Sequence, residues 1–380
     1  MSTLRVDVPG RAAGSYDVVV AAGALDRLGE HCRRAAPAHA YAVISDSRVA
    51  EHYAGRALDS LRASGARAEL FTFPAGEWNK TRETWSALSD QLLDAGFGRD
   101  GVVVALGGGV TGDLGGFVAS SFMRGVPVVQ VPTTVLAMVD SSVGGKTGVD
   151  TRSAKNSIGH FHHPSLVLID PRLLSTLAPF QRNSGLAESV KMAAMRDASL
   201  FEWLEEHAET LVAGDDAALA VLIERSVALK ANVVAEDPEE SGVRAILNFG
   251  HTAGHALEAL SDFSLLHGEA VAQGARLETR LGEAIGLTDP GTADRLEALL
   301  RRCDLPEDYD RDLSGRRILE AARVDKKARA GVLRWSLPAR IGESARGPEG
   351  SWTHEIDASI CEETLDAALR TASEVPDSPS

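Results

Sequence analysis

Runs of aliphatic and β-branched residues alternate with amphipathic segments over the first half of the chain. Five short apolar runs predict strands, at residues 41–45, 68–73, 101–106, 126–131 and 166–169. Residues 24–34 and 82–95, which lie between such runs, carry apolar side chains at helical spacing. Strands that are apolar throughout are typical of a parallel sheet covered by helices on both faces. The pattern therefore predicts an α/β domain with a Rossmann-like, mostly parallel sheet over residues 1–178.

From Pro179 onward the pattern becomes helical. Apolar residues recur at helical spacing over residues 184–207, 216–236, 253–260, 269–285 and 292–303. A brief strand-like run lies at residues 333–337, and the last ten residues, TASEVPDSPS, are typical of a frayed tail. We therefore predict a second, mainly helical domain over residues 179–380.

The net charge of −15 limits the partners that the chain can bind. The negative electrostatic field of such a chain repels phosphate. The charge therefore argues against a protein that wraps nucleic acid or coats an anionic membrane. The 380 residues, 44% hydrophobic and 24% charged, are typical of a globular protein large enough for two cores. Any phosphate site must therefore be a local one.

Cysteine usage and the N-terminal sequence bear on the compartment. The three cysteines, Cys32, Cys303 and Cys361, are far apart and odd in number, which favours a reducing compartment without a disulfide framework. The first twenty residues lack the apolar core of a signal peptide, and no run reaches the roughly 20 apolar residues of a membrane span. We expect a cytoplasmic protein.

Three histidines stand out in the segment Leu247–Val271. His251 and His255 are four residues apart, so they share one face of a helix. His267 follows His251 by sixteen residues, after a polar break at residues 261–262, so a second helix could return it to the first pair. The spacing suits an open, catalytic metal site. Surface or capping histidines are the alternative, and the spacing alone does not say which of the three bind metal.

A glycine-rich turn follows the strand at 101–106. Residues 107–113 read Gly-Gly-Gly-Val-Thr-Gly-Asp, and an apolar helix comes next. Glycines after a strand let backbone amides approach a phosphate at a helix N-terminus. The spacing differs from G-x-G-x-x-G, so a plain tight turn is the alternative.

Three charged residues at the ends of other strands could contact the same nucleotide. Asp46 ends the strand at 41–45, where a carboxylate can accept hydrogen bonds from a ribose diol; an ordinary helix N-cap is the alternative. Glu77 and Lys80 follow the strand at 68–73, where a charged surface turn is an equally good interpretation.

Basic and hydroxyl side chains are dense between residues 123 and 156. The basic members are Arg124, Lys146 and Lys155, and the neutral donors are Thr133, Thr134, Ser141, Ser142 and Asn156. In an acidic chain such a cluster indicates a site for a phosphorylated small molecule. Solvated loops are the alternative, although Gly144-Gly145 indicates backbone brought close to a ligand.

The second half carries further charged residues at helical spacing. Glu188 and Lys191 share a helix face and form either a surface ion pair or a metal ligand beside a catalytic cation. Lys230, Glu240, Arg244 and Asn248 precede the histidines, and a salt-bridged helix face is the alternative there. His160, His162 and His163 precede a proline in what reads as a loop, and we expect no metal on them.

Taken in chain order, these motifs resemble the sugar phosphate cyclase superfamily, and within it most closely the 3-dehydroquinate synthase family. The resemblance runs from Asp46 to Lys327. The matching motifs are PAGE with Lys80, GGGVTGD, MRG, VPTT, VDSSVGGKTG, KN, GLAE with Lys191, the 230/240/244/248 series, NFGHTAGH, LHGEAV and DKK.

The resemblance implies a role for each motif residue. A zinc ion, which cobalt can replace, would be held by Glu188, His251 and His267. Catalysis would fall to His255, Lys146, Lys191, Asp140 and Glu240, and His255 would act on the substrate without binding metal. NAD would contact Asp46, Glu77, Lys80, Gly108, Gly109, Val110, Asp113, Thr133, Thr134, Lys146, Lys155 and Thr176. The substrate would meet Arg124, Asn156, Lys230, Arg244, Asn248 and one of Lys326 and Lys327.

The reaction of that family explains this set of residues. A seven-carbon phosphorylated keto acid is oxidised by NAD, phosphate leaves, NADH returns the hydride, and an intramolecular aldol step closes a carbocycle. The resemblance also implies a shikimate-pathway enzyme that acts as a homodimer.

Some positions depart from the family wording, so other functions stay open. These are Ser189-Val190 and Met192-Ala193 around Lys191, Ala253, Asp150 and Phe180-Gln181. An amino-dehydroquinate synthase or another cyclase of secondary metabolism is one alternative. A metal-dependent polyol dehydrogenase is a second, although it needs no phosphate cluster. A silent nucleotide-binding regulator is a third, although it would have no reason to keep a metal site and a base together.

Overall fold

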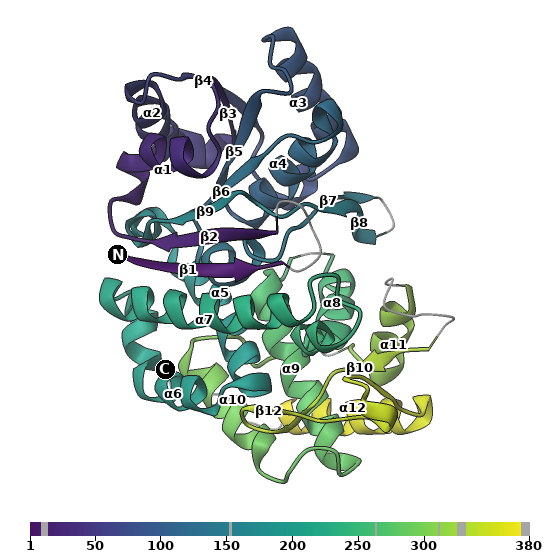
Figure 1. Cartoon of the computed structure of the whole chain (residues 1–380). Coiled ribbons are helices and arrows are strands. Elements are labelled where there is room, and N and C mark those ends of the chain that lie inside the picture. Colours follow the sequence, from purple (N-terminus) through teal and green to yellow (C-terminus); the bar gives the residue numbers. More distant parts are fainter. Residues whose placement is uncertain (9–13, 152–153, 263, 311, 325–331, 374–380) are drawn as a thin grey trace. The chain divides into compact units, whose positions relative to one another are not determined.

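The computed structural model describes residues 1–8, 14–151, 154–262, 264–310, 312–324 and 332–373 (Figure 1). They form two compact units. The first comprises Met1–Ala178 with Asp216–Glu239, and the second comprises Pro179–Asp215 with Glu240–Ser380. The division predicted from the sequence, 1–178 and 179–380, differs in one helix, α7 (Asp216–Glu236). This helix belongs to the first unit because it packs against strand β1 (Ser2–Asp7) and helix η4 (Ala137–Ser141) of that unit.

A seven-stranded sheet forms the first unit. Its order is β1-β2-β9-β6-β5-β3-β4, and every neighbouring pair except β1 and β2 is parallel. The strands are β1 (Ser2–Asp7), β2 (Ser15–Val20), β3 (Ala40–Asp46), β4 (Arg67–Phe73), β5 (Gly101–Gly107), β6 (Val128–Pro132) and β9 (Leu166–Ile169). All residues of β5, β6 and β9 are buried, which is the burial expected of central parallel strands.

Right-handed crossovers place the helices of the first unit on both faces of the sheet. The chain moves toward β4 through α1 and α2 and moves back through α3 and α4, so the two pairs lie on opposite faces. In agreement, α1 packs on α2 and α3 packs on α4. The helices are η1 (Ala24–Arg27), α1 (Leu28–Ala35), α2 (Ser47–Ala63), η2 (Glu77–Asn79), α3 (Arg82–Asp94), α4 (Gly109–Ser121), η3 (Phe122–Arg124), η4 (Ala137–Ser141), η5 (Pro171–Thr176) and α7.

The reversal of strand order creates a switch point between β3 and β5. Connections leave these neighbouring strands toward opposite faces, so the carboxyl ends of β3 and β5 border a crevice. Asp46 ends β3 and Gly107 ends β5. The residues that the sequence singled out for a nucleotide therefore lie where open α/β sheets bind ligands.

A hairpin, β7 (Lys146–Thr151) and β8 (Ala154–Phe161), extends from the first unit. The sequence analysis read this region as loops, and that interpretation is wrong for these residues. Glycines and basic residues conceal the alternation of a strand, and cross-strand pairing such as that of Lys146 with Phe161 stabilises the hairpin. Backbone pairing of Asp150 with Lys80 and a bridge to Thr81 attach it to the rest of the unit.

Helices dominate the second unit. They are α5 (Pro179–Arg196), α6 (Ala198–Ala213), η6 (Val243–Asn248), α8 (His251–Leu260), α9 (His267–Ala284), α10 (Thr292–Arg302), α11 (Gly315–Val324), η7 (Pro348–Gly350) and α12 (Ala358–Ser373). Four short strands complete it: β10 (Arg334–Trp335), β11 (Pro338–Arg340), β12 (Glu343–Ser344) and β13 (His354–Glu355). A core around Leu257, Leu281, Ile318, Trp335 and Leu365 joins α8, α9, α11 and α12.

The predicted fold class is confirmed: a mostly parallel sheet precedes a mainly helical part. One predicted helix, 184–207, is wrong as a single element. Asp197 breaks it, because its carboxylate accepts a hydrogen bond from the Leu200 amide at 2.9 Å and starts α6 as an N-cap.

All three cysteines are buried, and burial raises the pKa of the Cys32 and Cys303 thiols to about 12 and that of Cys361 to about 11. Such thiols are unreactive. Among the described helices, none has the length and apolarity needed to cross a bilayer.

Candidate functional site

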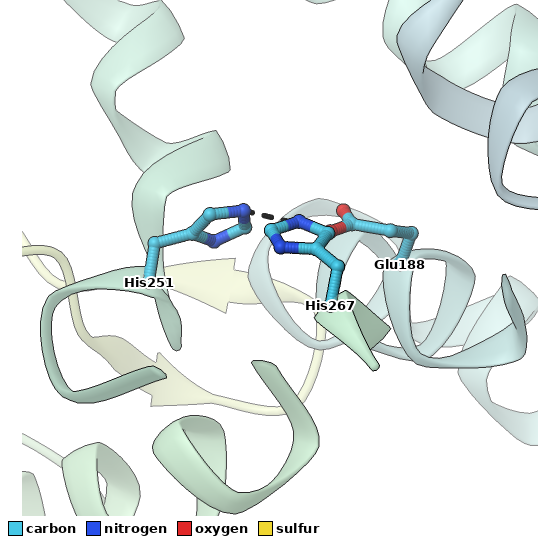
Figure 2. A group of neighbouring side chains, drawn as sticks. All are labelled: Glu188, His251 and His267. Carbon is cyan, nitrogen blue, oxygen red and sulfur yellow. Dashed lines mark ion pairs between the residues drawn. The ribbon is translucent and has the colours of Figure 1, made fainter. Parts of the chain in front are cut away.

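Three ligand-type side chains from three helices of the second unit converge on one point. Glu188 lies in α5, while His251 and His267 are the first residues of α8 and α9. The Nε2 atoms of His251 and His267 lie 3.5 Å and 3.4 Å from Glu188 Oε1. One donor atom from each residue lies within 4.8 Å of the others, and Figure 2 shows the three side chains pointing toward one another.

Close backbone contacts hold these three helices together. A Cβ atom on Gly268 would lie only 1.8 Å from the carbonyl oxygen of Ser184, so the start of α9 touches α5 directly, one turn before Glu188. A Cβ atom on Gly274 would lie 2.1 Å from the carbonyl oxygen of Gly250 at the start of α8. Glycine at these contacts brings His251, His267 and Glu188 within reach of one another.

The Nδ1 atoms of His251 and His267 also face oxygen atoms. His251 Nδ1 lies 3.1 Å from the carbonyl oxygen of Phe249, and His267 Nδ1 lies 3.5 Å from Glu258 Oε1. Partners of this kind orient a metal-ligating imidazole and leave Nε2 for the ion. Burial alone lowers the pKa of His267, but the carboxylates of Glu188 and Glu258 raise it to about 9. The same negative charge favours a divalent cation between these groups.

The donor set fits zinc or cobalt. Two imidazole nitrogens and one carboxylate oxygen are the protein ligands of many catalytic zinc sites, in which a fourth position stays open for substrate. Geometry alone also allows a second group, His255, Glu258 and His267. The ring centroids of His251 and His255 are 5.2 Å apart, which confirms that the two residues share a helix face.

Polar residues predicted for substrate and catalysis surround this cluster in the second unit. Lys191 is buried, pairs with Glu188 and donates a 2.8 Å hydrogen bond to the carbonyl oxygen of Leu247. It is therefore not the surface ion pair that was the alternative for Glu188 and Lys191. Asn248 Nδ2 donates to Glu240 Oε1 at 2.6 Å, and Arg244 is also buried.

The glycine-rich turn of the first unit has the expected form. Gly108 is the N-cap of α4, with Gly109 and Val110 as its first two residues, and no side chain caps that helix. The Thr133 amide donates to the Gly107 carbonyl at 2.9 Å, which places the VPTT segment beside the turn. The buried hydroxyl of Thr133 has no hydrogen-bond partner among the described residues. A buried hydroxyl in this state beside a helix N-terminus is well placed to bind a polar ligand.

Lys80 is buried and lies at the centre of a partly exposed acidic cluster. Its Nζ lies 2.9 Å from Glu77 Oε1, 3.3 Å from Asp113 Oδ2 and 3.7 Å from Asp150 Oδ1. Burial alone lowers the pKa of Lys80, but the three carboxylates raise it above its usual value. Burial raises the pKa of Asp113 to about 6, although Lys80 opposes the shift. Glu77 and Lys80 are thus part of an ion-pair network around a buried lysine and not of a plain surface turn.

We expect Lys80→Ala to lower the free energy of unfolding by about 2–3 kcal/mol, because it leaves three partly buried carboxylates facing one another without their cation. Urea denaturation measures this difference. The control is Arg56→Ala, which removes an exposed ion pair with Asp26 and should cost about 1 kcal/mol or less. Equal losses for the two variants would contradict the central role of Lys80.

Other residues predicted for the nucleotide also have protein partners. Asp46 Oδ1 accepts from the amides of Arg48 and Val49, each at 3.0 Å, so Asp46 caps α2 as the alternative interpretation proposed. Its Oδ2 lies 3.3 Å from Thr111 Oγ1. Thr176 Oγ1 lies 2.8 Å from the Tyr53 hydroxyl.

The predicted anion-binding residues of the first unit occupy the ends of η3 and the hairpin. Arg124 and Asn156 are exposed and have positive φ angles of 67° and 51°, while Lys146 is exposed at the start of β7. Lys155 is half-buried in β8, and Thr134 accepts from the Ala137 amide at 3.2 Å.

Helix α7 brings Lys230 to Asp140, two residues predicted for the site from distant segments. Lys230 is buried, and its Nζ lies 2.7 Å from Asp140 Oδ1 and 2.6 Å from the Asp140 carbonyl oxygen. Because α7 belongs to the first unit, this pair lies in the same unit as the glycine-rich turn. The sequence analysis expected Lys230 in the second domain, and it missed this pairing.

The remaining expectations concern two lysines near the C-terminus and the histidines at residues 160–163. Lys326 and Lys327 lie outside the described residues. The groups of possible metal ligands found among the described residues do not include His160, His162 or His163. His160 lies in strand β8 and not in the predicted loop. The sequence analysis missed Glu258, although its spacing of seven from His251 places both on one face of α8.

Family models extend over most of the chain. Residues 70–184 match the model of the 3-dehydroquinate synthase N-terminal domain, and residues 185–328 match that of its C-terminal domain. A 3-dehydroquinate synthase of Pelobacter propionicus is 44% identical over 344 residues, which are 90% of this chain and 95% of the relative. These matches confirm the family that the motifs indicated.

Two solved structures of cyclases share the fold. A 2-deoxy-scyllo-inosose synthase in complex with carbaglucose-6-phosphate, NAD⁺ and Co²⁺ matches with a TM-score of 0.87 and 25% identity, over 96% of this chain and 99% of that one. The 2-epi-5-epi-valiolone synthase of Streptomyces hygroscopicus, with NAD⁺ and Zn²⁺ bound, matches with a TM-score of 0.84 and 30% identity, over 97% and 99%. Sequence and fold agree, and the chain belongs to the 3-dehydroquinate synthase family.

Proposed function

We propose that this chain converts 3-deoxy-D-arabino-heptulosonate 7-phosphate into 3-dehydroquinate and phosphate, with NAD and a divalent zinc or cobalt ion as cofactors. The observation that carries the proposal is the Glu188/His251/His267 donor set, found in a chain 44% identical to a 3-dehydroquinate synthase over 90% of its length. The reaction oxidises one carbinol, eliminates phosphate, reduces the ketone again and closes the ring.

Glu188, His251 and His267 would hold the metal, which would supply Lewis-acid stabilisation of the alkoxide character that develops at the oxidised carbinol. Glu258 would keep His267 in the tautomer that presents Nε2, and the Phe249 carbonyl would do the same for His251. Lys191 adds a buried positive charge next to Glu188, which suits an anionic group of the substrate beside the metal.

NAD would bind at the carboxyl edge of the parallel sheet and supply the hydride acceptor and donor. The switch point between β3 and β5, the amides at the start of α4 and the Thr133 hydroxyl support this site. The proposed contacts in this unit are Asp46, Glu77, Lys80, Gly108, Gly109, Val110, Asp113, Thr133, Thr134, Lys146, Lys155 and Thr176.

The substrate phosphate and carboxylate would be bound by cationic and amide side chains. Arg124, Asn156 and Glu240 are three of the seven non-glycine residues with positive φ in the described part of the chain. Strained backbone of this kind concentrates where function requires a particular side-chain direction. The proposed substrate contacts are Arg124, Asn156, Lys230, Arg244, Asn248 and one of Lys326 and Lys327.

His255 would move the proton in this reaction. It lies one turn along α8 from His251, and its ring centroid is 5.8 Å from that of His267, so it is next to the proposed ligands. Imidazole titrates near neutral pH and can both accept and return a proton. Asp140, Glu240, Lys146 and Lys191 complete the proposed catalytic set.

We expect phosphate release to continue for many turnovers per NAD without net NADH, because a cyclase oxidises and then reduces the same substrate. Simultaneous assays of phosphate and of absorbance at the NADH band test this. Arg124→Ala should weaken substrate binding, seen as a higher KM, with little change in NAD affinity. NADH that accumulates in proportion to product without phosphate would contradict the cyclase and favour the polyol dehydrogenase.

A related cyclase activity is the second candidate. The departures at Ala253, Asp150 and residues 189–193 favour it, and the structural matches form other products, as their names state. Purified protein is offered the keto acid phosphate and, separately, its amino analogue. A product only from the amino analogue would replace the proposed substrate while leaving the reaction type intact.

A further inference from the structure

A buried carboxylate links the two helices that carry the histidines. Glu278, the twelfth residue of α9, is fully buried, and its Oε2 and Oε1 accept hydrogen bonds from the amides of Gly250 at 2.8 Å and Ala253 at 2.9 Å. These amides belong to the start of α8: Gly250 is its N-cap and Ala253 its third residue. Glu278 thus binds the first turn of the neighbouring helix with both oxygens.

Helix α8 depends on this carboxylate for its N-terminal bonds. Its own N-cap, Gly250, has no side chain to offer, and the first amides of a helix have no partner within the helix. A fully buried carboxylate in turn requires compensation, which two N–H donors and the positive end of a helix provide. Each group would be unfavourable without the other, so the contact fixes α8 against α9.

This contact lies directly behind the histidines. His251 follows Gly250 in α8, His255 is one turn further along, and His267 begins α9. Gly250 and Gly274 touch backbone to backbone, so no side chain separates the helices at this contact to absorb a shift. A movement of α8 along or about α9 would therefore move His251 and His255 relative to His267.

We propose that Glu278 is a positioning residue of the metal site: by binding the first turn of α8 from α9, it fixes the distance and angle between His251 and His267. This inference rests on the proposed metal site. The two hydrogen bonds of Glu278 described above end on backbone amides, so its effect on the ligands is transmitted through the backbone of α8.

The test is Glu278→Gln, in which the side chain keeps its size but loses its charge and one of its two acceptors. Binding of Co²⁺ to the full-length, metal-free protein is measured by equilibrium dialysis, and the visible absorption of the cobalt protein reports ligand geometry. We expect Co²⁺ to bind about 10-fold more weakly. We also expect the cobalt bands to shift in position or intensity.

Glu283→Gln is the matched control. Glu283 lies on the same helix, and its Oε1 accepts a hydrogen bond from the Ala293 amide at 3.0 Å in the first turn of α10, which carries none of the proposed ligands. This variant should lower thermal stability in a similar way and leave cobalt affinity and absorption unchanged. The pair separates positioning of the ligands from support of the fold.

The outcomes are distinct. If the parent protein binds no Co²⁺, the proposed metal site itself fails. If the parent binds Co²⁺ and Glu278→Gln matches it in affinity and absorption, the role of Glu278 is overturned, whatever its thermal stability. Circular dichroism checks that the metal-free variant is folded. If the Glu278→Gln variant is not folded, Glu278→Asp is compared with the parent in the same way. Asp keeps the charge but is one methylene shorter, so the carboxylate lies farther from the α8 amides.

Discussion

Removal of divalent metal with a chelator is expected to lower turnover by about 10³-fold or more, and added Zn²⁺ or Co²⁺ should restore it. A Lewis acid contributes several kcal/mol to a transition state in which negative charge develops on oxygen. Each 1.36 kcal/mol corresponds to a factor of about ten in rate. The expected loss follows from the Glu188, His251 and His267 donor atoms, which lie within 4.8 Å of one another.

Glu188→Gln extends this test to the ligand itself. The amide oxygen is a weaker donor than the carboxylate, and the buried Lys191 loses its charged partner, so metal should not restore full activity. Glu209→Gln is the control, because Glu209 forms only an exposed ion pair with Arg302. Full activity in rigorously metal-free parent protein would rule out this metal site.

The regular part of the fold was predictable because its signals are local. The apolar runs that became β3, β5, β6 and β9 carry β-branched residues that are buried in the sheet. The run that became β4, an edge strand, buries Ala68, Phe71 and Phe73. By contrast, the sequence analysis did not predict β1 and β2. β1 lies at the edge of the sheet, and along it exposed residues alternate with less exposed ones; β2, its antiparallel neighbour, begins with Ser15-Tyr16-Asp17 and so lacks a long apolar run.

The placement of α7 shows a limit of a different kind. Its boundaries, Asp216–Glu236, were predicted from periodicity, yet the unit to which it belongs was not. Periodicity shows which face of a helix is buried but not which partner buries it. The partner here, β1, is more than 200 residues earlier in the chain, and the Lys230 contact with Asp140 depends on the same packing.

The residues of the candidate site also fall into those predictable from local sequence and those that depend on contacts between distant segments. His251, His255, His267 and Glu188 are visible in short motifs, because helical spacing alone limits which side chains can meet. The roles of Glu258 and Glu278 depend on contacts between helices. Glu258 meets His267 from another helix, and Glu278 binds amides 25 and 28 residues away. No spacing rule specifies such partners in advance.

His255→Ala is expected to lower kcat by about 10²- to 10⁴-fold, the range for a general acid–base residue. Metal content should stay at the level of the parent protein. The residue shares a helix face with His251, and geometry alone would also allow it to bind metal with Glu258 and His267. The two possible ligand sets, with and without His255, make opposite predictions. If His255 is a ligand, the variant loses metal; if it is a proton relay, the variant keeps metal. Metal analysis after gel filtration, run beside the rate measurement, decides between them.

The structure favours the set without His255 through the charge around each group. Glu188 is buried and pairs with Lys191. Its carboxylate faces Nε2 of both His251 and His267, so an ion between the two rings would also contact Glu188. Glu258 instead faces Nδ1 of His267, the nitrogen that a supporting carboxylate usually binds. His255→Ala should therefore leave the cobalt absorption of the protein close to that of the parent. If metal content falls together with kcat, His255 is a ligand, and the proton relay must be sought in another side chain.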